Sequence, residues 1–127
     1  LREVKRVLKP GGIFIIMDVM SPGHPVRDIW LQTVEALRDT SHVQNYSSGE
    51  WLSLITEAGL ITRTLTTDRL PLEYPSWIAR MRTPEALSQA IRLYQESASA
   101  EVKAYFELRE DGSFTSDTIM AEAQKVG

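Results

Sequence analysis

The feature that most constrains the fold is an unbroken apolar run, IFIIM at residues 13–17, which directly follows the turn sequence KPGG. A strand with one face in water alternates apolar and polar residues, and this run shows no alternation. Continuous runs are typical of strands covered on both faces, as in a sheet flanked by helices. The run therefore predicts an α/β protein and implies a neighbouring strand on each side.

The segments around this run carry signals for further helices and strands. Ser47 and Glu50 have the S-x-x-E spacing of a capping box, and Gly59 follows as the expected C′ residue of that helix. Pro71 is expected to end the Thr-rich strand that comes next. The predicted order is helix 1–8, strand 13–19, helix 25–40, helix 48–58, strand 60–70, shorter helices up to about 106, and strand 114–125.

Length and charge exclude several classes of protein. A chain of 127 residues is enough for one domain with a modest core, and we expect a single partial domain over residues 1–127. The net charge of -3 without a basic block argues against nucleic acid as a partner. No apolar run is long enough to span a bilayer, and the absence of cysteine fits a reducing, cytoplasmic location.

Several stretches together resemble class I S-adenosylmethionine-dependent methyltransferases. The stretch LREVKRVLKPGGIFIIMD is similar to the helix, turn and fifth strand of that family. YSSGEWLSLITEAGLITRTL is similar to the next helix and the sixth strand, and TIMAEAQKV to the seventh. EYPSWIARMRTPEAL resembles the ubiquinone/menaquinone-biosynthesis type within the family, methyltransferase type 11.

The resemblance implies a Rossmann-like sheet of which only a portion is present. The three predicted strands would be the fifth, sixth and seventh of the family, with the last one antiparallel and placed between the other two. One neighbour of the IFIIM strand is then present and the other is absent. The chain also begins without Met, as if inside a domain. It therefore looks like the C-terminal half of a methyltransferase.

The cofactor half of the family is not recognisable in this sequence. The family binds S-adenosylmethionine through a glycine-rich loop that follows a strand and opens a helix, whereas Gly11 and Gly12 precede a strand. We therefore expect S-adenosylmethionine as the cofactor of an intact parent and no cofactor binding by this chain alone. No cofactor-binding residue is assigned.

Candidate site residues cluster after the first strand and at the end of the following helix. His42 is the candidate base for the methyl acceptor, with Asp39 orienting it, since histidine titrates near neutral pH. The other reading is that His42 is a solvated connector residue. The candidates for binding a small or medium-sized acceptor are Asp18, His24, Arg38 and Tyr46. Asp18 is equally readable as a polar strand end, and His24 as a helix N-cap.

Two further functions have less support in the sequence. Asp39 and His42 have a spacing that places two metal ligands on one helical face, but no second motif supplies a third ligand, so no metal site is assigned. The sequence contains no nucleophile elbow, so the hydrolase interpretation has no support.

The unpaired side of the first strand leads to a prediction about assembly. An edge strand with free backbone groups is a template for pairing. We predict a homodimer through Ile13–Val19 and the helices beside it, with Val26, Trp30 and Val34 among the side chains left open by the missing half. The alternative to an enzyme fragment is a non-catalytic interaction or dimerisation module.

Overall fold

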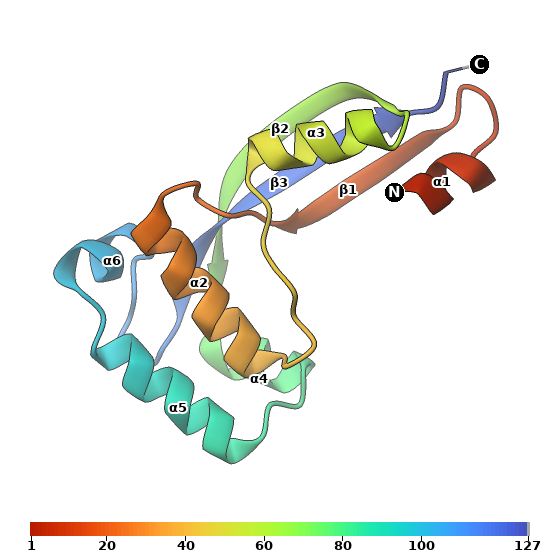
Figure 1. Cartoon of the computed structure of the whole chain (residues 1–127). Coiled ribbons are helices and arrows are strands. Elements are labelled where there is room, and N and C mark those ends of the chain that lie inside the picture. Colours follow the sequence, from red (N-terminus) through yellow and green to blue (C-terminus); the bar gives the residue numbers. More distant parts are fainter. Residues whose placement is uncertain (127) are drawn as a thin grey trace. The chain divides into compact units, whose positions relative to one another are not determined.

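The computed structural model describes residues 1–126 and consists of three strands and six helices. The elements are α1 (Arg2–Val7), β1 (Ile13–Val19), α2 (Pro25–Arg38), α3 (Ser48–Glu57), β2 (Ile61–Leu72), α4 (Tyr74–Arg80), α5 (Glu85–Glu96), α6 (Ala100–Tyr105) and β3 (Phe114–Gln124) (Figure 1). The predicted order of elements is confirmed, and the three strands begin within one residue of the positions expected from the sequence.

The chain folds as two compact units, which are described separately. Unit 1 contains residues 1–20, 46–68 and 117–127, and unit 2 contains residues 21–45 and 69–116. The strands β2 and β3 contribute residues to both units. The expectation of one domain over the whole chain stays a prediction.

Unit 1 is built on a sheet with the strand order β1-β3-β2. β1 and β3 are antiparallel, with Ile13 opposite Gln124 and Val19 opposite Thr118. Figure 1 shows β3 between the other two strands. The predicted order, with the last strand antiparallel and in the middle, is therefore confirmed. β1 lies at the edge of this sheet.

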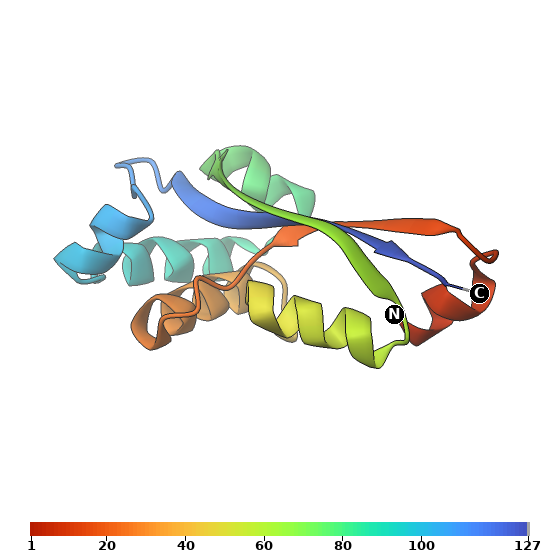
Figure 2. The same cartoon turned by 90° about the horizontal axis from the view of Figure 1, so that it is seen from above.

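One face of the sheet in unit 1 is covered by helices. Figure 2 shows α1 and α3 on the same side of the strands. Ile16 from β1 and Ile55 from α3 are buried in a common core cluster that also contains Ala121 from β3. The predicted capping box begins α3: Ser47 Oγ accepts from the Glu50 N–H, and Glu50 Oε1 accepts from the Ser47 N–H. This double cap fixes where the helix starts.

The side chains of β1 that point to the opposite face from Ile16 are not covered within the described residues. Ile13, Ile15 and Met17 alternate with the buried Ile16 and are 44%, 54% and 75% exposed. Met120, which lies opposite Met17 on β3, is 41% exposed. The sequence predicts that β1 is buried on both faces. In the part of the chain that the structure describes, only one face of β1 is covered, by α1 and α3.

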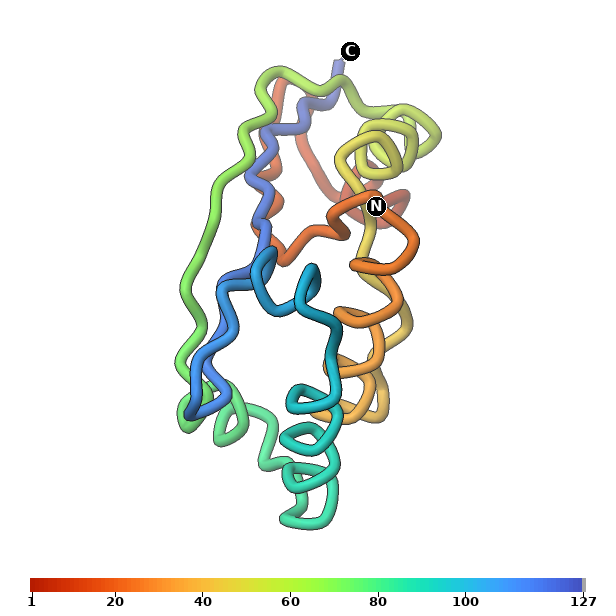
Figure 3. The backbone as a smooth tube through the Cα atoms, turned by 90° about the vertical axis from the view of Figure 1, so that its left-hand side faces the viewer, coloured from red at the N-terminus to blue at the C-terminus, as the bar shows by residue number. Residues whose placement is uncertain are grey.

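Unit 2 is a helical cluster packed around aromatic side chains. α2 packs against α5 and α6, and Figure 3 shows α2 and α5 side by side. Trp30 contacts Phe106 at a ring-centroid distance of 4.5 Å and Phe114 at 5.5 Å. Trp77 meets Phe114 edge-on at 5.2 Å and is 1% exposed. These rings exclude water from the centre of the unit.

Two expectations about packing are wrong. Trp30 and Val34, which were expected to lie open beside a missing half, are 3% and 0% exposed inside unit 2. Val26, from the same helix, is 53% exposed. β2 continues through Pro71 to Leu72, because a proline without an N–H is tolerated in an edge strand.

A glycine close to the centre of unit 2 permits a tight approach. Gly112 has a φ of +94°, and a Cβ there would lie 2.8 Å from the ring of Tyr74 and 2.9 Å from Gln95 Oε1. The Gln95 side chain is fully buried and donates a hydrogen bond to the Gly112 carbonyl. Any larger residue at this position has to displace that packing.

Candidate functional site

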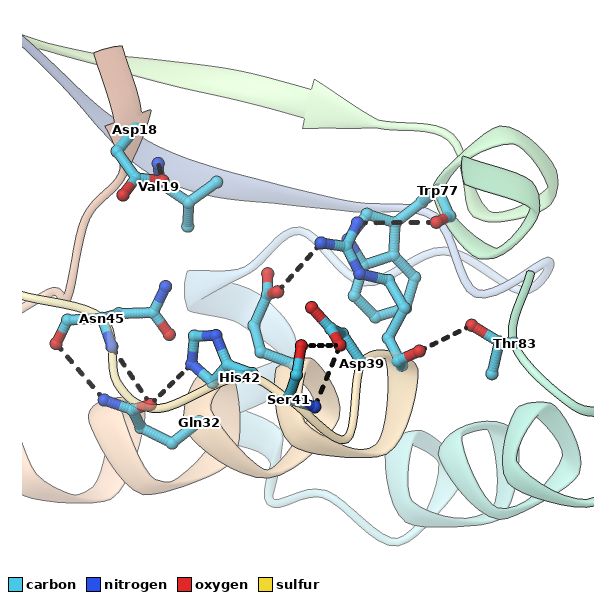
Figure 4. Close-up of polar contacts among 11 residues, drawn as sticks. Asp18, Val19, Gln32, Asp39, Ser41, His42, Asn45, Trp77 and Thr83 are labelled. Carbon is cyan, nitrogen blue, oxygen red and sulfur yellow. Dashed lines mark hydrogen bonds and ion pairs between the residues drawn. The ribbon is translucent and has the colours of Figure 1, made fainter. Parts of the chain in front are cut away.

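The connector that follows α2 is held against the helix by one glutamine. The Nε2 atom of Gln32 donates to the Asn45 carbonyl at 3.3 Å, and Gln32 Oε1 accepts from the Asn45 N–H at 3.2 Å. Gln32 Oε1 also lies 3.0 Å from Nε2 of the half-buried His42 (Figure 4). One amide therefore fixes both the path of the connector and one nitrogen of the imidazole.

The same cluster contains a buried polar atom without a partner. Asn45 is 7% exposed, and its side-chain oxygen makes no hydrogen bond in the structure. Leaving a buried acceptor unsatisfied costs about 1–3 kcal/mol. This oxygen is therefore a candidate acceptor for a donor group of a bound molecule.

Asp39 lies at the C-cap of α2, but its carboxylate is turned to its own loop. Asp39 Oδ1 accepts from the Ser41 hydroxyl at 2.6 Å and from the Ser41 N–H at 3.0 Å. These two hydrogen bonds, the hydroxyl first, hold the pKa of Asp39 below its ordinary value. The described ring contact of His42 is with Gln32. The orienting role of Asp39 stays a prediction.

Gln32 was not among the residues singled out in the sequence. It lies ten positions before His42, in the middle of a helix, and no local motif marks that relation. The ten-residue spacing between Gln32 and His42 does not predict a contact, because the two side chains meet only where the connector folds back over the helix.

Arg38 is engaged inside unit 2. Its guanidinium forms an ion pair with the buried Glu35 at 3.3 Å and lies 4.7 Å from the centre of the Trp77 ring. Its side chain is 18% exposed. Glu35 already supplies a compensating carboxylate, so less of the Arg38 charge is available to an anionic acceptor.

His24 is exposed at the N-cap of α2, and its side chain makes no capping hydrogen bond. Its role in binding the methyl acceptor stays a prediction.

Asp18 and Tyr46 belong to a groove of about 750 Å³ in unit 1. Tyr46 meets the Trp51 ring edge-on at a centroid distance of 5.4 Å. Asp18 is exposed, and its Oδ1 accepts from the Val19 N–H at 2.8 Å. The groove is lined by residues from α1, β1, Tyr46 and α3: Leu1, Arg2, Val4, Phe14, Ile15, Ile16, Met17, Asp18, Tyr46, Trp51, Leu54, Glu57 and Ala58. It presents a mostly apolar surface with two carboxylates, a guanidinium and a phenol.

The six predicted site residues thus belong to two groups. Asp18 and Tyr46 share the groove of unit 1, and the other four, His24, Arg38, Asp39 and His42, lie in unit 2 at the two ends of α2 and in the connector. The roles assigned to them stay predictions.

The described residues do not fit the cofactor loop of a methyltransferase. Gly11 and Gly12 lie in the turn before β1, and the loop between β1 and α2 contains a single glycine, Gly23. A phosphate- or cofactor-cradling loop between a strand and a helix normally needs several glycines. No step of a reaction is therefore assigned to the cofactor within this chain.

Residues 1–126 contain neither a metal site of the usual kind nor a membrane-spanning helix. No group of three or more His, Cys, Asp or Glu side chains is arranged to hold a metal ion in this range. In the same range, every helix is too short or too polar to cross a membrane.

Comparison with known proteins places the chain beside methyltransferases. No protein-family model matches the sequence. The chain is 74% identical over 125 residues to the protein YafE of Escherichia coli, covering 98% of this chain and 60% of YafE. It is 36% identical over 106 residues to the methyltransferase YcgJ of Bacillus subtilis, covering 84% of this chain and 42% of YcgJ.

Two solved structures have the same fold over nearly the whole chain. BH2331 of Bacillus halodurans, described as a candidate methyltransferase, matches with a TM-score of 0.88 and 28% identity over 99% of this chain and 61% of its own. The YcgJ structure matches with a TM-score of 0.85 and 34% identity over 99% of this chain and 56% of its own.

In every one of these matches, the chain aligns with only part of the longer relative. The chain spans less than two thirds of each of these relatives, which fits a chain corresponding to the C-terminal part of a methyltransferase. The resemblance and the partial Rossmann-like fold expected from the sequence are both confirmed. In sequence and in fold, the chain is related to methyltransferases.

Proposed function

We propose that this chain supplies the acceptor side of an S-adenosylmethionine-dependent methyltransferase, acts on a small or medium-sized acceptor, and does not transfer methyl groups alone. The observation that carries the proposal is the methyltransferase fold at a TM-score of 0.88, without a cofactor loop in the described residues. His42 would serve as the base and Asn45 as a hydrogen-bond acceptor, beside the other predicted binding residues.

Calorimetric titration with S-adenosylmethionine tests this proposal. We expect no binding by the 127-residue chain at micromolar concentration, and binding by YafE, which is longer and 74% identical over the matched part. Micromolar binding by the short chain would contradict the proposal that this chain supplies only the acceptor side and does not bind the cofactor alone. Failure of YafE to bind would contradict the cofactor assignment itself.

The predicted role of His42 has its own test. In a longer methyltransferase that includes this chain, we expect His42→Ala to lower kcat with little change in the affinity for S-adenosylmethionine. The reason is that a base acts on the methyl acceptor and not on the cofactor. An unchanged kcat would mean that His42 is only a connector residue.

A second candidate function is an interaction or dimerisation module, favoured by the open edge of β1. Ile15 and Met17 are half to three-quarters exposed on a strand with one unpaired side. Each large apolar side chain left in water forgoes roughly 1.5–3 kcal/mol of burial. Two copies that pair their β1 strands across a twofold axis would form a six-stranded sheet, twice the three strands of one copy.

Light scattering after gel filtration distinguishes the assembly states. We expect a mass about twice 14.4 kDa, or a higher oligomer, for the wild type and for Leu93→Lys, since Leu93 is 67% exposed on α5. Met17→Lys should reduce the mass to that of one chain, because it places a charge at the paired edge. A folded wild-type monomer would refute the homodimer.

A further inference from the structure

The hydrogen bonds around Gln32 determine which nitrogen of His42 carries a proton. A backbone N–H only donates and a carbonyl only accepts. The Asn45 N–H lies 3.2 Å from one end of the Gln32 amide, and the Asn45 carbonyl lies 3.3 Å from the other. These two contacts orient the amide, with the oxygen at the end that faces the Asn45 N–H.

That oxygen is also the atom that faces the imidazole. Gln32 Oε1 lies 3.0 Å from His42 Nε2, and an amide oxygen cannot donate a proton. The hydrogen bond therefore requires that His42 Nε2 carries the hydrogen. In the neutral ring, Nδ1 then has the lone pair, and Figure 4 shows that nitrogen on the side of the ring turned away from Gln32.

We propose that Gln32 is the positioning residue for His42: it holds the neutral imidazole as the Nε2–H tautomer and leaves Nδ1 as the atom that accepts a proton or a hydrogen bond. The part of this inference that concerns methyl transfer rests on the proposed function. In that reaction the acceptor's proton would pass to Nδ1 and produce an imidazolium, whose Nε2–H is still bonded to Gln32. The acceptor's heteroatom would keep the electron pair of the broken bond and so become the nucleophile that is methylated.

The position of Asp39 supports this assignment by elimination. Imidazoles that act as bases are commonly oriented by a carboxylate, but the Asp39 carboxylate is engaged with Ser41. A neutral amide fixes the ring without adding a negative charge beside it. Asp39→Asn is therefore a matched control that changes a nearby carboxylate and leaves the Gln32 contact in place.

Nitrogen-15 NMR of the histidine side chains tests the tautomer in the 127-residue chain. At a pH where His42 is neutral, we expect a pyrrole-type signal at Nε2, a pyridine-type signal at Nδ1, and an Nε2–H proton protected from exchange. Asp39→Asn should preserve this pattern. Gln32→Ala should remove the exchange protection, and Gln32→Glu, whose carboxylate can still accept, should restore it. A pyrrole-type signal at Nδ1 in the wild type would overturn the inference.

Kinetic measurements on a longer methyltransferase that includes this chain separate the inference about Gln32 from the proposed function. We expect Gln32→Ala to lower kcat with little effect on the KM for S-adenosylmethionine, and to cause little further loss in combination with His42→Ala. Additive losses would overturn the positioning role. If the NMR pattern holds but His42→Ala leaves kcat unchanged, the tautomer assignment survives and the base assigned under the proposed function fails.

Discussion

Ile55 is the residue at which the packing of unit 1 can be tested most directly. It is fully buried on α3, in a cluster with Ile16 and Ala121, and Phe14 packs against that cluster. Ile55→Ala removes three carbon atoms, which at about 0.8 kcal/mol each corresponds to about 2.4 kcal/mol of lost burial. A residual cavity adds about 1–2 kcal/mol, so the free energy of unfolding should fall by about 3–4 kcal/mol.

Urea denaturation followed by circular dichroism measures this loss. With a slope of about 2 kcal/mol per molar urea, the midpoint should fall by about 1.5–2 M. Ile55→Val should lower the stability by only about 0.5–1.5 kcal/mol, which provides a scale if the alanine variant does not fold. Leu52→Ala on the same helix is the control, because Leu52 is 41% exposed. A loss below about 1 kcal/mol for Ile55→Ala would refute the assignment of this cluster as the core of unit 1.

Three further changes test local features of the chain. Ser47→Ala should lower the free energy of unfolding by about 1 kcal/mol, measured by urea denaturation, because it removes one half of the capping box. Gly112→Ala should lower the melting temperature more than Gly23→Ala, since both glycines have positive φ but only the Gly112 Cβ would meet neighbouring atoms at 2.8 Å; equal shifts would contradict the packing. Ser41→Ala should raise the pKa of Asp39 toward its ordinary value in an NMR titration, because the stronger of its two hydrogen bonds is lost. The stability that Asp39 contributes is present above the ordinary aspartate pKa and is lost as the pH falls through the lowered folded value. Ser41→Ala should therefore be less stable than the wild type above the ordinary aspartate pKa, and this difference should disappear in acid.

The sequence alone determined the elements of this protein. The apolar run and the β-branched stretches predicted the three strands, and the spacing of Ser47 and Glu50 predicted the start of α3. Gly59, with a φ of +82°, ends that helix as expected. These signals are readable because each one depends on residues within a few positions of one another, where backbone geometry and local hydrogen bonds decide the conformation.

The tertiary structure alone decided the surroundings of the candidate site. Periodicity showed that α2 is amphipathic, but only the packed unit shows that Trp30 is buried and Val26 exposed. The sequence places Asp39 near His42, and only the folded connector shows that Gln32 contacts the His42 ring. Such contacts join residues many positions apart, and their geometry depends on how the connector closes over the helix. That closure is fixed by packing and by hydrogen bonds to the backbone, neither of which leaves a pattern in the sequence.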